Sequence, residues 1–156
     1  MKITILQVGK TKDSYIEEGL KEYEKRLQAF CSLEKITLKE STGAKSKQEQ
    51  IQEESKEIIK KLSSHKDHKK ILLDISGRAL SSEEFASTIK RIRDFETGKI
   101  IFIIGGPYGV SDTVRKAVDL RLSLSKSTFT HQMIRLIFLE QIYRAFTIIE
   151  GKKYHY

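Results

Sequence analysis

Short apolar runs and longer amphipathic stretches alternate along the whole chain. The apolar runs have the length of strands and lie at residues 3–8, 33–38, 70–75, 100–104 and 120–124. Between them, the spacing of apolar residues and the capping residues predict helices over about 15–30, 48–63, 82–97, 112–118 and 132–149. This alternation has no linker or break in composition. It predicts a single α/β domain over residues 1–156, with a mostly parallel sheet flanked by helices.

Individual residues mark where these elements begin and end. Ser81 and Glu84 have the spacing of a capping box, which predicts a helix start. Residues 76–78 are expected to end the third strand, and the helix over 48–63 is expected on the surface. Apolar stripes are predicted to begin at Tyr15 in the first helix and to end at Phe95 in the third. The last helix is apolar almost all round, so it needs cover on most sides, which a partner subunit would supply.

Glycine and proline are concentrated directly after the buried strand at 100–104. Three of the nine glycines and the only proline lie within residues 105–109. The pattern fits a turn that lets a ligand approach the main chain, and it equally fits an ordinary turn. It matches neither the dinucleotide-binding nor the phosphate-loop motif. A second irregular segment, the small polar run 125–128, follows the next predicted strand, and open α/β sheets bind ligands at such strand ends.

The charge of the chain narrows the class of partner. A net charge of +8 and a pI near 9.5 favour a polyanion, with nucleic acid first and an acidic membrane surface second. Lys45 and Lys47 lie in a polar loop, where they either contact phosphate or are simply solvated. The single cysteine, Cys31, excludes an intrachain disulfide.

No apolar run approaches the roughly 18 residues of a membrane span, and the N-terminus does not resemble a secretory signal. We therefore expect a soluble cytoplasmic protein with no membrane partner. No metal is expected either, because His65 and His68 lack further ligands and are predicted to be solvated.

A few polar residues of the last helix and its flanks are candidates for chemistry. Glu140 and Arg144 have ion-pair spacing, which suits a helix-supporting salt bridge or a dimer contact as well as catalysis. His131 is either a helix-entry residue or a proton carrier. Tyr154 and His155 combine an aromatic surface with an imidazole beside lysines, which suits an extruded base, whereas the alternative is a frayed terminus.

Several motifs in order resemble the RlmH family of ribosomal RNA methyltransferases, which are SPOUT-class enzymes. The matching segments are ITILQVGK, LLDISGRALSSEEFA, IIGGPYG, LSLSKSTFTHQMIR, EQIYRAF and the Tyr-His near the C-terminus. The resemblance implies a homodimer that transfers a methyl group from S-adenosylmethionine to N3 of a pseudouridine in 23S ribosomal RNA. Two positions depart from the family pattern: Thr130 stands where many members have proline, and Tyr156 stands where a basic residue is common.

The resemblance also implies a C-terminal trefoil knot and a set of cofactor-binding positions. These positions are Leu73, Gly105, Leu124, Ser125, Lys126, Ser127, Thr128 and Phe129. A trefoil knot would be an exception to the general rule that chains are unknotted. The positions coincide with the ends of predicted strands, where backbone groups in tight loops can recognise an adenine edge.

A mechanism follows in outline from the substrate that the resemblance implies. N3 of pseudouridine carries an imide proton that must leave before the nitrogen attacks the methyl group. Our hypothesis is that Glu140 or His155 accepts this proton, while Arg144 or Arg135 stabilises the developing charge and Tyr154 packs on the base. The rival hypothesis is a non-catalytic RNA-binding or ribosome-associated module. It explains the charge and leaves the paired irregular loops without a purpose.

Overall fold

The computed structural model describes residues 1–153, and within them five strands and five helices alternate along the chain. In order they are β1 (Lys2–Val8), α1 (Ser14–Leu27), β2 (Ser32–Leu38), α2 (Lys47–Ser63), β3 (Lys69–Ala79), α3 (Ser82–Phe95), β4 (Lys99–Ile104), α4 (Asp112–Lys116), β5 (Leu120–Ser123) and α5 (Met133–Ile149). The predicted order of elements and the α/β class are thereby confirmed.

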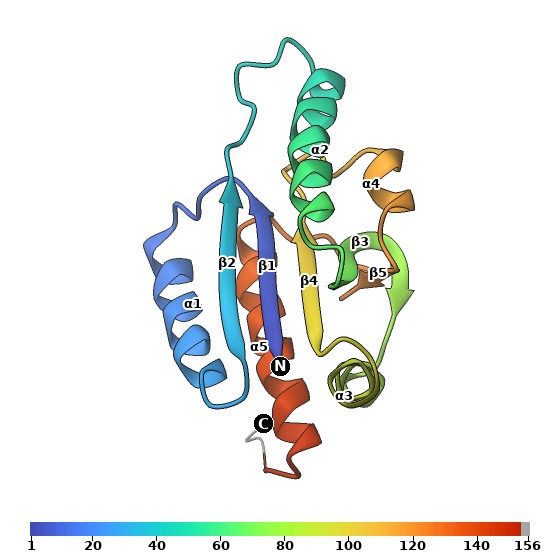
Figure 1. The fold of residues 1–156 in the computed structure, drawn as a ribbon. Coiled ribbons are helices and arrows are strands. Elements are labelled where there is room, and N and C mark those ends of the chain that lie inside the picture. The colour runs from blue at the N-terminus through green and yellow to red at the C-terminus, as the bar shows by residue number, and fades with distance from the viewer. Residues whose placement is uncertain (154–156) are drawn as a thin grey trace.

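All five strands are parallel and form one sheet in the order β2-β1-β4-β3-β5. β4 occupies the centre between β1 and β3, and helices cover both of its faces (Figure 1). This position explains the unbroken run of apolar residues in β4, all of which are buried. Because the strands are parallel, their C-terminal ends and the loops that follow them lie along one edge of the sheet.

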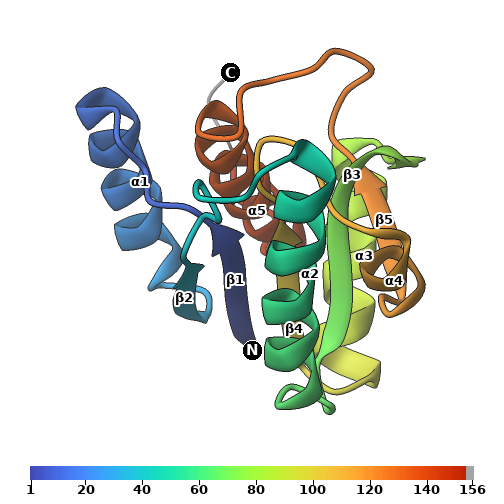
Figure 2. The same cartoon turned by 90° about the horizontal axis from the view of Figure 1, so that it is seen from above.

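Helices cover both faces of the sheet. Ile3 and Ile5 of β1 pack in a cluster with α1, α3 and α5, whereas Leu6 and Val8 pack in another with α2 and α4. This division follows from the alternation of side chains along a strand. Figure 2 shows α2 on one side of the sheet and α5 on the other.

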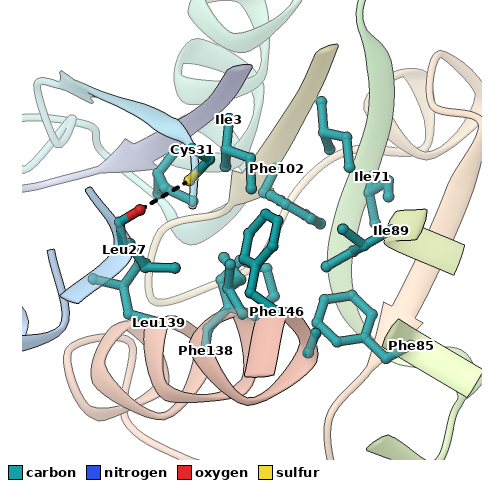
Figure 3. Close-up of a cluster of buried hydrophobic side chains, with 14 of the residues drawn as sticks. Ile3, Leu27, Cys31, Ile71, Phe85, Ile89, Phe102, Phe138, Leu139 and Phe146 are labelled. Carbon is teal, nitrogen blue, oxygen red and sulfur yellow. Dashed lines mark hydrogen bonds between the residues drawn. The ribbon is translucent and has the colours of Figure 1, made fainter. Parts of the chain in front are cut away.

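The larger cluster is organised around aromatic side chains of α5. Phe138 meets Phe102 of β4 edge to face with ring centroids 4.8 Å apart, and Phe85 of α3 lies 6.3 Å from both rings (Figure 3). The thiol of Cys31 lies 3.7 Å from the Leu27 carbonyl at the rim of this cluster. Fully burying side chains of this size contributes about 1.5–3 kcal/mol each, so this cluster fixes α5 on the sheet.

The structure corrects four local expectations. β3 does not end at residues 76–78 but continues to Ala79, with a break in its register between Leu73 and Arg78. Tyr15 and Phe95, placed on apolar stripes, are 61% and 82% exposed because both lie at helix ends, where the sheet no longer covers them. His68 is buried rather than solvated.

The contacts of His68 explain why the expectation that it is solvated was wrong. Its Nδ1 lies 2.8 Å from an Asp67 carboxylate oxygen, and its ring packs against that of His65 at 4.8 Å.

No cluster of metal-ligating side chains is found within residues 1–153, and no helix in that range has the length and hydropathy of a membrane span. The trefoil knot stays a prediction.

Candidate functional site

A cavity of about 360 Å³ opens where β4 and β5 end and where the register of β3 breaks after Leu73. Its walls are residues 73–75 of β3, the turn 104–110 after β4, residues 122–125 and 127–129 at and after β5, Arg115 of α4, and His131 and Ile134 at the start of α5. The C-terminal ends of parallel strands are where open α/β sheets bind ligands. The cavity therefore joins the two irregular segments that the sequence singled out.

The turn after β4 depends on its glycines. A Cβ on Gly105 would lie 2.8 Å from a methyl group of Val110, and one on Gly106 would collide with a carboxylate oxygen of Glu54. Gly109 has a φ of 82°, a region that residues with a side chain rarely adopt, and its amide donates to the Gly106 carbonyl at 3.0 Å. The turn thus presents bare backbone to the cavity, which favours a ligand held by main-chain groups.

Buried polar residues of α2 support this turn from behind. The Glu54 carboxylate is 2% exposed and accepts hydrogen bonds from the Ser41 amide at 3.1 Å and from the Gln50 side chain at 2.9 Å. The neighbouring Ser55 hydroxyl accepts from the Ser111 amide at 2.9 Å. α2 therefore ties the loop after β2 to the loop after β4.

Sequence reasoning missed these supporting residues because they are polar. The apolar residues whose spacing predicts α2 are isoleucines and a leucine, including Ile58 and Leu62. Gln50 and Glu54 continue the same line by steps of four towards the start of the helix. That spacing was the available signal for their burial.

The break in β3 shapes a second wall of the cavity. Leu122 of β5 pairs with both Leu73 and Arg78, so the residues between them bulge out of the strand. Asp74 begins this bulge and accepts hydrogen bonds from the Ser76 amide at 3.0 Å and from Arg115 Nε at 2.9 Å.

These contacts set the charge state of Asp74. Burial by itself would raise the pKa of its carboxyl group, but the hydrogen bonds from Ser76 and the Arg115 guanidinium outweigh burial and lower it. The same ion pair raises the pKa of Arg115. The cavity wall therefore carries a fixed pair of opposite charges, which costs less to bury than either charge alone.

The cavity brings together seven of the eight positions expected to bind a cofactor. Leu73 lines it from β3 at the register break, Gly105 and Leu124 line it directly after β4 and β5, and Ser125, Ser127, Thr128 and Phe129 line it from the loop after β5. Lys126 is the exception and is not among the lining residues. The loop is folded by its own side chains, because the Ser125 hydroxyl accepts from the Ser127 amide at 2.9 Å.

His131 is the one expected catalytic residue that lines this cavity among the residues described. It is half-buried, and burial lowers the pKa of its imidazole, as do the positive charges of Arg135 and Lys12. The Glu40 and Glu54 carboxylates act in the opposite direction and are outweighed. The ring is therefore neutral near pH 7 and can accept a proton.

Arg135 lies behind the cavity rather than in its wall. Its side chain is 1% exposed, and it donates to the Val8 carbonyl at 2.6 Å and to the Thr11 hydroxyl at 3.0 Å. Burial lowers the pKa of this guanidinium, against the effect of the Glu40 carboxylate. These contacts fasten the start of α5 to the end of β1.

The other expected catalytic residues do not line the cavity. Glu140 accepts two hydrogen bonds from Arg144, at 2.9 and 3.1 Å, and one from Gln141 at 2.6 Å. Glu140, Gln141 and Arg144 lie further along α5, on a half-buried face that also carries Ile137. Tyr154 and His155, like Tyr156, lie outside the described residues.

The comparisons with known proteins agree on one family of enzymes. A family model described as predicted SPOUT methyltransferase matches residues 1–155. A ribosomal RNA large subunit methyltransferase H of Cytophaga hutchinsonii is 41% identical over 156 residues, covering 100% of both chains. The protein of the same name from Bacillus pumilus is 39% identical over 158 residues, covering 99% of both.

A solved structure supports the fold. The crystal structure of a tRNA (m1G37) methyltransferase from Aquifex aeolicus superposes with a TM-score of 0.54 at 15% identity. The match covers 92% of the present chain and 70% of that one.

Proposed function

Because the chain belongs to the SPOUT methyltransferase family and groups with full-length ribosomal RNA large subunit methyltransferase H relatives, we propose that it methylates N3 of a pseudouridine in 23S ribosomal RNA. S-adenosylmethionine is the proposed methyl donor. The observation that carries the proposal is the cavity at the ends of β4 and β5 and the register break of β3, whose lining includes seven of the eight expected cofactor positions.

The cavity suits a nucleoside-containing cofactor in size and chemistry. Its volume of about 360 Å³ is in the usual range for small-molecule sites. Ile104, Leu122 and Ile134 give it apolar walls, while the backbone of Gly105 and Gly106 lines it and offers donors and acceptors. Bound there, S-adenosylmethionine would supply an electrophilic methyl group.

The proposed mechanism requires removal of the imide proton from N3. We propose Glu140 or His155 as the acceptor, with His131 as a third candidate because its imidazole faces the cavity and is neutral near pH 7. Arg144 is the proposed stabiliser of charge on the ring, and Tyr154 the proposed stacking partner of the base. For Arg135, the contacts with Val8 and Thr11 favour a role in positioning α5.

A homodimer is part of the proposal. Ile134, Ile137 and Ile148 remain partly exposed along α5, and they recur at the spacing of one helix face. A second copy covering this face would also bury the Glu140–Arg144 pair.

We further propose that the protein works in the cytoplasm on assembled ribosomes. Naked 23S RNA is then expected to be a poor substrate, and equal methylation of naked and assembled RNA would contradict this.

The first test is calorimetric titration with S-adenosylmethionine, comparing Gly105→Ala with Gly43→Ala. The new methyl group at residue 105 crowds Val110 in the cavity wall, whereas at residue 43 it meets nothing within 4 Å. We expect saturable binding that Gly105→Ala weakens and Gly43→Ala leaves intact. A folded protein that binds ribosomes but no cofactor would support the RNA-binding module instead.

The second test is methyl transfer to ribosomes that lack the modification. We expect the double variant Glu140→Gln/His155→Ala to lose turnover while keeping cofactor affinity, because neither residue is among the expected cofactor positions. Wild-type turnover in this variant would refute the assignment of the base, and His131→Gln would then be the next variant to measure.

A further inference from the structure

Five exposed lysines gather along the edge of the sheet where the cavity opens. Lys10 and Lys12 lie in the loop after β1, Lys39 and Lys45 in the loop after β2, and Lys47 begins α2. Both loops follow the C-terminal ends of their strands (Figure 1). We call these five residues the lysine rim. Within residues 1–153, none of the five forms an ion pair.

Three lysines at the opposite edge of the sheet are neutralised. Lys2, Lys69 and Lys99 stand at the starts of β1, β3 and β4. They form ion pairs with Glu34 at 2.8 Å, Glu96 at 3.4 Å and Asp67 at 2.5 Å, respectively. The lysines that begin these three strands are therefore compensated, whereas the five lysines of the rim form no ion pair in the described part of the chain.

Carboxylates near the rim cancel only part of its charge. The five lysines share their segments with three carboxylates, Asp13, Glu40 and Glu49. Glu49 accepts a hydrogen bond from the Lys45 amide at 2.5 Å in the first turn of α2, and Glu40 interacts with the buried Arg135. Uncompensated lysines repel one another, and an anion bound across them would remove that repulsion.

The rim is held beside the cavity by specific contacts. The Lys47 ammonium lies 5.1 Å from the ring centroid of Tyr108, a half-exposed residue of the cavity wall. The amide of Lys12 donates to the Gln132 side chain at 2.6 Å, next to His131. Glu54 holds the loop after β2 through the Ser41 amide. Both lysine-bearing loops are therefore fixed relative to the cavity mouth.

We propose that the lysine rim binds the phosphate backbone of the RNA that flanks the target nucleotide, with Lys47 and Tyr108 at the point where that nucleotide leaves the strand for the cavity. The inference rests on the proposed function for the identity of the RNA. Lysine is a point-charge ligand for phosphate, and an aromatic ring next to it offers a surface on which a base can stack. The geometry thus assigns one edge of the fold to substrate docking.

The test compares variants that remove equal charge at the two ends of α2. Lys45→Gln/Lys47→Gln removes two rim charges, while Lys60→Gln/Lys66→Gln removes two exposed charges at the far end of the helix. Co-sedimentation with ribosomes that lack the modification gives the affinity at several KCl concentrations. Cofactor affinity is measured in parallel by calorimetry.

We expect the rim variant to bind ribosomes roughly tenfold more weakly. The slope of log affinity against log salt should become shallower by about 1.4–1.8, because each lost phosphate contact contributes about 0.7–0.9. The control variant and Lys45→Arg/Lys47→Arg should match the wild type, and cofactor affinity should be unchanged in all of them.

Three results would overturn the inference. One is a rim variant with wild-type affinity and salt slope, and a second is an equal loss in the control variant, which would indicate net charge alone. Rim-dependent binding to phosphatidylglycerol vesicles in place of ribosomes would also overturn it. Binding does not require turnover, so a protein that binds through the rim but transfers no methyl group would refute the proposed function and leave the rim standing.

Discussion

Gly77 lies in the bulge of β3, where that strand touches β5 most closely. A Cβ at this position would lie 2.6 Å from the Arg121 carbonyl carbon and 2.7 Å from the Leu122 nitrogen. Both are backbone atoms, so the contact cannot be relieved by rotating a side chain. Ordinary contact begins at 3.4 Å, so in Gly77→Ala the two strands must separate by roughly 0.8 Å.

The cost of this separation can be worked out from the sheet. Overpacking a well-packed site typically costs about 1–3 kcal/mol. β5 is an edge strand that pairs with β3 and with no other strand in the described chain, so no second strand resists the displacement. For a domain of this size each 1 kcal/mol corresponds to roughly 2–4 °C, so the melting temperature should fall by about 2–12 °C.

Urea denaturation followed by circular dichroism measures the loss, with Gly43→Ala as the matched control. Gly43 has no atom within 4 Å of its Cβ position and no positive φ. Its replacement should be neutral or stabilising by about 0.4–1 kcal/mol, because alanine restricts the unfolded chain. Displacement of β5 should also weaken cofactor binding, since Leu122, Ser123 and Leu124 line the cavity. Equal urea midpoints for the two variants would refute the packing argument.

Three further predictions concern single side chains. Burial raises the pKa of the Cys31 thiol to about 11, so a thiol reagent at pH 8 should label the native protein slowly and the urea-unfolded protein fast. The pKa of His131 lies below its ordinary 6.5, so the unfolded chain takes up a proton first as the pH falls. Stability should therefore drop below about pH 6.5, and His131→Gln should flatten this drop in urea titrations. Ser81→Ala removes the acceptor for the Glu84 amide and should cost about 1 kcal/mol by thermal melting.

The fold was predictable where a local pattern decides the structure. The five apolar residues of β4 are buried on both faces because that strand is central, and the capping box at Ser81 and Glu84 is present in full. The order of the strands in the sheet could not be predicted from the sequence, because it depends on which strands, far apart in the chain, pair with each other. Gly77 looked like a turn because glycine suits turns, and only the neighbouring β5 shows that it allows close approach of two strands.

The site was predictable in part for a similar reason. The glycine turn and the polar run after β5 stood out, and the resemblance to a family assigned them a cofactor. The buried Glu54 did not stand out, because the burial of a carboxylate depends on the Ser41 and Gln50 donors that it meets in space. The lysine rim was not predictable either. Whether a lysine forms an ion pair depends on its neighbours in space and not on its position in the sequence.

The central place of β4 has a consequence for how this chain is synthesised. β1 lies opposite β4 from Lys2, which faces Lys99, and β3 flanks β4 on its other side. A nascent chain that ends before residue 99 therefore holds two apolar strands whose shared neighbour does not yet exist. Direct pairing of those two strands would close the gap that β4 must enter, so the topology predicts this mispaired sheet as a kinetic trap during synthesis.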